Sequence, residues 1–161
     1  MTLSRTDGSR FPAWLSALIF IVVTVGISLV IGFLTRPGEW YETLAKPAFN
    51  PPSWVFGPVW TILYVLIGIA GWRIWRLAPA SLAMKLWFAQ MILNWCWSPA
   101  FFGAESPLMA LAIIVALLAC ILMFMVSAAR HSRSAAWLFV PYLAWVAFAT
   151  ALNGSIVAMN S

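Results

Sequence analysis

The sequence predicts an all-α membrane protein, with five transmembrane helices in a single integral membrane domain that covers residues 1–161. The first observation behind this prediction is composition: hydrophobic residues make up 64% of the chain and charged residues only 8%, against about 25% in soluble domains. The second is the presence of five apolar stretches, each close to the roughly 20 residues that a helix needs to cross the hydrocarbon core. This composition excludes a soluble domain of the same size.

The five spans are placed at residues 12–34, 54–77, 81–102, 107–130 and 134–158. The first span is too long for the apolar core of a signal peptide, and no small-residue cleavage site follows it, so it should remain in the mature protein. Only a few residues connect the second span to the third, the third to the fourth and the fourth to the fifth. We therefore expect antiparallel neighbouring helices in a compact bundle.

The basic residues are distributed unevenly between the two sides of this topology. Two of them, Arg36 and Lys46, fall on one side, and the other side carries Arg5, Arg10, Arg73, Arg76, Lys85, Arg130 and Arg133. The positive-inside rule then places the N-terminus in the cytoplasm and the C-terminus outside. Because the charge follows the membrane topology, the net charge of +5 is not interpreted as a nucleic-acid-binding surface.

The connection over residues 35–53 differs from the others because it is long, aromatic and rich in proline. Proline at this density argues against a regular helix and stiffens the chain. We predict a lid over the outer end of the bundle, and the alternative is an interfacial belt in which Trp and Tyr anchor at headgroup depth. The candidate lid residues are Trp40, Tyr41, Pro47, Pro51 and Pro52.

The sequence gives little support to acid–base, nucleophilic or metal chemistry. No Asp or Glu lies within a span, which disfavours an ion-coupled carrier, and there is no carboxylate pair, His-activated nucleophile or glycine-rich phosphate loop. Cys96 and Cys120 lie inside spans, and the single histidine, His131, lies in a short basic turn. We therefore predict no catalytic residue and no metal site.

Aromatic rings mixed with a few amides are the unusual feature of the spans. In the third span they recur every three or four residues and so share one helical stripe, which consists of Trp87, Gln90, Asn94, Trp97 and Phe101. At about 1.5 Å per residue, Trp60, Asn94 and Asn153 lie at similar depths beneath the loop. This favours a ligand pocket. The alternative is that the amides are interhelical hydrogen bonds and the rings are packing.

Several motifs of this chain resemble the tryptophan-rich sensory protein family, whose eukaryotic members are the mitochondrial translocator protein or peripheral benzodiazepine receptor. They are WY at 40–41, KP at 46–47, NPPSWVFGPVWT at 50–61, LNWCWSP at 93–99, FFG at 101–103, PYLAW at 141–145 and ATALN at 149–153. The motifs occur in the order of the family.

The resemblance implies a five-helix bundle, commonly a homodimer, that binds porphyrins and other hydrophobic ligands beneath the loop between the first two helices. Carried over by motif, the ligand-binding residues would be Trp60, Tyr64, Asn94, Trp97, Phe101, Trp145, Ala149, Leu152 and Asn153. Trp60 and Trp145 match the two tryptophans that are proposed to take part in porphyrin photo-oxidation. Porphyrin is expected as a ligand and not as an iron-ligated cofactor, because His131 lies on the opposite side of the membrane.

One departure from the family concerns sterols. The sterol motif of animal members places an aromatic residue and a base after the Leu-Asn pair, whereas this chain continues from Asn153 as GSIVAMNS. The tail fits a bacterial member, and sterol binding is not predicted from it. The predicted function is a membrane-embedded receptor or regulator of tetrapyrroles; the alternatives are a porphyrin-degrading enzyme and a facilitative transporter of tetrapyrroles or sterols.

A homodimer would use small-residue faces, since these let helices approach closely in lipid. The two candidate faces are Ala112, Ala116 and Ala119 on the fourth span, or Gly68 and Gly71 on the second.

Overall fold

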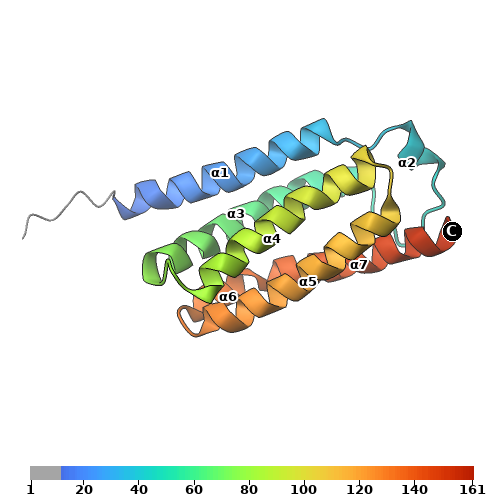
Figure 1. Ribbon diagram of the computed structural model, residues 1–161. Helices are drawn as coiled ribbons and strands as arrows, with labels where there is room; N and C mark the ends of the chain where they lie inside the picture. Colours follow the sequence, from blue (N-terminus) through green and yellow to red (C-terminus); the bar gives the residue numbers. More distant parts are fainter. Residues whose placement is uncertain (1–11) are drawn as a thin grey trace, which may run out of the picture.

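The computed structural model describes residues 12–161, and all their regular structure is helical (Figure 1). Arg5 and Arg10, which contributed to the topology prediction, lie outside the described residues. The elements in chain order are α1 (Ala13–Leu34), α2 (Glu39–Thr43), α3 (Ser53–Leu77), α4 (Leu82–Ser98), η1 (Pro99–Gly103), α5 (Pro107–Ala129), α6 (Arg133–Leu138) and α7 (Val140–Met159). The prediction of an all-α fold is confirmed for this part of the chain.

Four helical segments between residues 12 and 161 are long and apolar enough to cross a membrane: α1, α3, α5, and α6 together with α7. The fifth predicted span is α4, which has 17 residues and continues directly into η1. These segments run side by side along the long axis of the molecule (Figure 1). The chain is therefore an integral multi-pass membrane protein.

Two predicted spans are not continuous α-helices, and proline lies at each interruption. The third span changes at Pro99 into the π-helix η1, in which the Ala104 N–H donates to the Pro99 carbonyl at 2.8 Å. The last span divides at Phe139 into α6 and α7, and Pro141 lies in the first turn of α7. Pro141 has no N–H to donate to the preceding turn, which explains the break.

The loop between α1 and α3 contains a short helix that the sequence did not predict. The helix α2 spans Glu39–Thr43, and Glu39 and Glu42 lie in its first turn. Carboxylates are favourable at a helix N-terminus. The nearest prolines, Pro37 and Pro47, lie outside the helix, so the expectation that proline excludes a helix here was wrong.

α1 packs mainly on α3 and lies at the edge of the bundle. A Cβ on Gly68 would be 3.0 Å from the Cα of Ile21, so Gly68 provides the close approach of these two helices. Two indole N–H groups then donate to serines of α1: Trp72 to Ser16 at 3.0 Å and Trp95 to Ser28 at 2.9 Å. Small residues and polar contacts of this kind hold helices together in lipid.

The two glycines of the second candidate dimer face contact other helices of the same chain. Gly68 faces Ile21, and a Cβ on Gly71 would be 2.3 Å from Cε2 of Trp87. Both glycines are buried. The hypothesis of a dimer through Gly68 and Gly71 was therefore wrong, because α1 and α4 already cover these positions.

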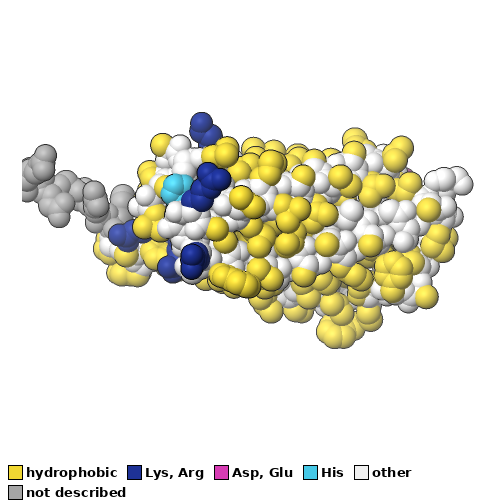
Figure 2. Space-filling view, turned by 90° about the horizontal axis from the view of Figure 1, so that it is seen from below, with side chains coloured by type: hydrophobic (Ala, Val, Ile, Leu, Met, Phe, Trp, Pro, Cys, Tyr) yellow, Lys and Arg dark blue, Asp and Glu magenta, His cyan; other side chains and the backbone are white. Residues whose placement is uncertain are grey.

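Most of the basic residues of the described chain gather at the end of the bundle opposite the α1–α3 loop (Figure 2). In the described residues this basic end carries Arg73, Arg76, Lys85, Arg130 and Arg133. It is closely packed: the rings of Phe124 and Phe139 lie 4.1 Å apart, and the Trp87 indole donates to the Ile67 carbonyl at 2.9 Å.

Candidate functional site

A cavity of about 990 Å³ lies at the loop end of the bundle. Residues of α1, α3, α4, η1, α5 and α7 form its wall, together with part of the α1–α3 loop. The wall contains all nine residues that were carried over by motif: Trp60, Tyr64, Asn94, Trp97, Phe101, Trp145, Ala149, Leu152 and Asn153. The structure thus brings residues from three separate segments of the sequence to one site, and their binding of a ligand stays a prediction.

Two pairs of stacked rings form much of the cavity wall. Trp60 and Tyr64 of α3 stack with centroids 5.2 Å apart, and Trp97 of α4 stacks on Phe101 of η1 at 5.3 Å. Trp145 of α7 meets Trp60 edge to face at 6.5 Å. Each stacked pair has a spacing of four residues, so helical periodicity places the two rings on one face. The site is an apolar, aromatic chamber.

Buried hydrogen bonds lie beside the cavity at its inner end. The Tyr64 hydroxyl donates to Oδ1 of Asn94 at 2.9 Å, and Nδ2 of Asn94 donates to the Tyr142 hydroxyl at 3.0 Å. The Tyr142 hydroxyl donates in turn to Oε1 of Gln90 at 3.0 Å. These bonds connect α3, α4 and α7. Asn94 therefore makes the interhelical hydrogen bonds that the sequence analysis gave as the alternative to a ligand pocket.

Asn153 of α7 also forms hydrogen bonds to two other helices. Its Oδ1 accepts from the Trp97 indole at 3.2 Å, and its Nδ2 donates to the Pro107 carbonyl at 2.9 Å. Each of these groups retains one further site, since an amide has two N–H groups and two lone pairs on its oxygen. Both amides therefore make interhelical hydrogen bonds, and their binding of a ligand through the remaining sites stays a prediction.

Trp145 carries a polar atom without a partner. Its Nε1 is buried and makes no hydrogen bond within residues 12–161. The Trp145 ring meets Phe56 at 5.8 Å and Phe148 at 5.6 Å. A buried N–H without an acceptor costs about 1–3 kcal/mol, so this position is occupied at the expense of stability.

The α1–α3 loop covers the outer end of the cavity through aromatic contacts. Trp40 and Tyr41 place their rings 5.9 Å and 6.1 Å from that of Phe101, and Tyr41 lies 5.4 Å from Phe102. Burial raises the pKa of the Tyr41 phenol, which keeps it neutral. The helix α2 is thus seated on η1, as a lid would be.

A second contact joins the loop to the end of α7. Asn160 accepts from the Ala45 N–H at 3.0 Å and donates to the Ala45 carbonyl at 3.0 Å, while Phe49 meets the ring of Phe148 at 6.1 Å.

Of the predicted lid residues, Tyr41, Pro51 and Pro52 line the cavity, and Trp40 and Pro47 do not.

The sequence reasoning missed several residues of the wall. Ile114 and Leu117 bring α5 into the site, and Ser28 and Trp95 border it on the α1 side. The i, i+3 spacing of Ile114 and Leu117 was a usable signal, but α5 is apolar on every face, so periodicity alone could not orient it. Arg36 and Lys46 also line the cavity, although the sequence analysis considered them only for the distribution of charge across the membrane.

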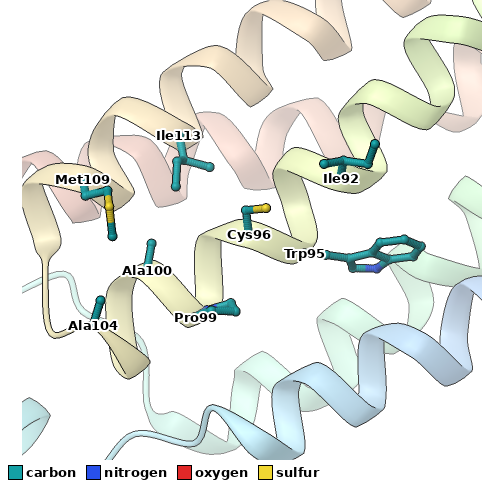
Figure 3. A pocket seen from close by; sticks show the side chains of 8 residues that line it. All are labelled: Ile92, Trp95, Cys96, Pro99, Ala100, Ala104, Met109 and Ile113. Atoms are coloured by element: carbon teal, nitrogen blue, oxygen red, sulfur yellow. The ribbon is translucent and has the colours of Figure 1, made fainter.

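A second hollow, of about 500 Å³, lies on the outer surface between α4, η1 and α5 (Figure 3). Cys96 faces α5 across this groove, where Met109 and Ile113 lie, and the Trp95 side chain extends away from it toward α1. The Trp95 N–H is already bound to Ser28. The groove offers apolar surface and one thiol, so it lacks the convergent polar groups of the larger cavity.

The histidine, cysteine and methionine that we considered as iron ligands, His131, Cys96 and Met91, lie outside the cavity wall. His131 follows the end of α5 at the basic end, Cys96 faces the outer groove, and Met91 is buried in the core. Between residues 12 and 161 no group of three or more His, Cys, Asp and Glu side chains could hold a metal ion.

The fold and the cavity together define a class of protein: a multi-pass helical membrane protein with a tryptophan-rich chamber beneath an extramembrane loop. Residues 18–159 match the TspO/MBR family. The chain belongs to this family, which confirms the resemblance found in the sequence, and its members are five-helix transmembrane bundles.

Relatives from three sources resemble the chain over most of its length. The tryptophan-rich protein TspO of Chlorobaculum tepidum is 39% identical, over 89% of this chain and 97% of the relative. The tryptophan-rich sensory protein of Cereibacter sphaeroides is 36% identical, over 91% and 92%. The human translocator protein is 36% identical, over 88% of each chain. The family thus comprises sensory and translocator proteins.

Proposed function

We propose that the protein is a membrane-embedded receptor or regulator that binds porphyrins and other flat hydrophobic ligands in the cavity beneath the α1–α3 loop. The observation that supports this most strongly is the combination of size and wall chemistry. Small-molecule pockets range over about 300–1,000 Å³, and this cavity is at the upper end at about 990 Å³. Its volume suits a large ring system, and its walls offer aromatic faces for stacking.

Recognition rests on stacking and shape and not on ligation of a metal. The rings that would contact the ligand are Trp60, Trp97 and Trp145, and no histidine, cysteine or methionine of the described chain lines the cavity. Metal-free protoporphyrin should therefore bind about as well as haem, and His131→Ala should change neither affinity. Iron-dependent binding with a spectrum of defined axial ligation would contradict this mode.

A second candidate function is light-dependent oxidative degradation of the porphyrin. Its support is the edge-to-face pair of Trp60 and Trp145, which lie 6.5 Å apart in the wall. Pigment loss in the dark would indicate an ordinary enzyme, and loss only under illumination a photochemical one. Unchanged pigment in both conditions favours the receptor, and flux of ligand into sealed vesicles would indicate a transporter.

The binding test uses the purified protein in lipid nanodiscs, titrated with protoporphyrin and followed by quenching of tryptophan fluorescence. Trp60→Leu and Trp145→Leu should each weaken binding while the protein remains folded. The matched control is Trp137→Leu, because Trp137 is 71% exposed and lies on α6, away from the cavity. An affinity that is the same in the wild-type protein and in all three variants would show that porphyrin partitions into lipid and does not enter the cavity.

We also propose a homodimer that forms through α5, in a bacterial membrane with the N-terminus on the cytoplasmic side. Ala112, Ala116 and Ala119 are all exposed along one side of α5, as a close helix contact requires. Ala116→Leu should reduce the cross-linked dimer in detergent, and an unchanged cross-linking pattern would exclude this face.

A further inference from the structure

Two cations, Arg36 and Lys46, line the cavity at the loop end of the bundle, whereas the other basic residues of the described chain lie at the opposite end. The remaining five lie at the basic end, where the positive-inside rule accounts for them. Arg36 and Lys46 have no such explanation, since they lie on the opposite side of the membrane. Their position above an otherwise apolar chamber needs another cause.

Neither cation forms a salt bridge within residues 12–161. The Arg36 guanidinium lies over the Phe33 ring at 3.9 Å, and Nζ of Lys46 lies over the Tyr41 ring at 4.5 Å. A cation–π contact positions a charged group while leaving its N–H donors available. Both cations are therefore held at the mouth without a permanent anionic partner.

The hydrogen bonds of Lys46 are long and replaceable. Its Nζ donates to the backbone carbonyls of Glu42 at 3.3 Å and Leu44 at 3.4 Å, beyond the usual N–H···O range. A carboxylate would form shorter, charge-assisted bonds with the same donors, and the guanidinium of Arg36 could bind a carboxylate through two parallel N–H groups.

We propose that Arg36 and Lys46 form a carboxylate-binding rim, so that the preferred ligands are flat hydrophobic molecules with one or two carboxylates at one edge. This proposal rests on the proposed function and specifies its ligand class. The ring system lies against Trp60 and the other aromatic walls, and the carboxylates remain at the mouth beside the two cations. Neutral ligands bind through the walls alone.

Glu42 provides an internal check of this assignment. It also lines the cavity, and its carboxylate lies on the same short helix as Tyr41, over which Lys46 is placed. A carboxylate there repels an anionic ligand. Glu39 lies one turn earlier on α2, is exposed and does not line the cavity, so it is a matched control for charge alone.

The experiment compares protoporphyrin with its dimethyl ester, which has the same ring but no ionised carboxylate. Affinities are measured in nanodiscs of neutral lipid, with empty nanodiscs as the reference. The wild-type protein should prefer the free acid by about tenfold or more, as expected for a charge-assisted hydrogen bond. Arg36→Gln with Lys46→Gln should remove this preference without weakening the ester, and Lys85→Gln at the basic end should leave it unchanged.

Glu42→Gln should strengthen binding of the free acid and not of the ester, whereas Glu39→Gln should have little effect on either. An acid-to-ester ratio that is the same in the wild-type protein and the double variant would overturn the rim while leaving the cavity as a porphyrin site. Equal changes in Glu42→Gln and Glu39→Gln would indicate a general charge effect and also overturn it. Absence of saturable binding for both ligands would instead contradict the proposed function.

Discussion

The basic end and the loop end of the bundle are built from the same five membrane-crossing segments, yet one end is packed and the other is hollow. At the basic end small residues allow close approach: Gly71 lies against the Trp87 indole, and Ala83, Ala128 and Ala135 are fully buried. At the loop end the facing positions carry large rings, and the cavity of about 990 Å³ lies between them.

The π-helix and the loop maintain this difference. η1 adds an i to i+5 turn after Pro99, which places Phe101 and Phe102 against Tyr41 of the loop. π-helical turns are frequent at functional sites. We therefore expect packing at the basic end to govern stability and the cavity at the loop end to govern ligand binding.

The largest expected effect is a loss of stability at the packed end. In Gly71→Leu the new side chain would collide with Trp87, because even its Cβ would be 2.3 Å from the indole. We expect a loss of about 3 kcal/mol in the free energy of unfolding, near the upper end for overpacking. The measurement is unfolding in mixed micelles. Gly26→Leu is the control, since a Cβ there has no neighbour within 4 Å, and similar losses in both variants would refute the division.

The next effect tests the boundary between the two ends. Tyr142→Phe removes the hydroxyl that joins Asn94 to Gln90 and leaves two buried amide groups with one partner fewer. Unfolding should become easier by about 1–3 kcal/mol. Thr61→Val removes an exposed hydroxyl that binds only within its own helix and should change little. If the two variants are equally stable, the buried chain of hydrogen bonds does not hold the helices together.

At the hollow end, a larger side chain should reduce affinity and spare stability. Ala149 is partly exposed in the cavity wall, one turn after Trp145, so Ala149→Leu occupies ligand volume without overpacking a core. Porphyrin affinity should fall about tenfold, or about 1.4 kcal/mol, with unfolding unchanged. Ala149→Thr should act in the same direction. Unaltered affinity for every flat ligand would place this residue outside the binding site.

The smallest effect concerns the turn between η1 and α5. Glu105 has φ of 49°, a left-handed conformation that glycine adopts more easily than glutamate. Glu105→Gly should stabilise the protein by up to about 1 kcal/mol and leave porphyrin affinity unchanged, because Glu105 is not in the cavity wall. Glu105→Ala removes the same charge but keeps the left-handed backbone strained. Equal stabilisation by alanine and glycine would therefore show that the gain in stability comes from loss of the charge.

Much of this arrangement followed from the sequence because its signals were local. Hydropathy located the spans, and spacings of three and four residues placed Asn94, Trp97 and Phe101 on one stripe of the third span. Other features depend on the relation between helices and could not be read in this way. The burial of Gly68 against α1 and the second role of Asn94 appear only when the helices are assembled. The uniform hydropathy of α5 concealed the contribution of Leu117 to the cavity.

The most direct test of the central claim is the position of bound protoporphyrin in an experimentally determined structure of the complex. We expect density for the ring inside the loop-end cavity, bordered by Trp60, Trp97 and Trp145. Density confined to the outer groove beside Cys96 and Met109, with the cavity filled by solvent or lipid, would contradict it.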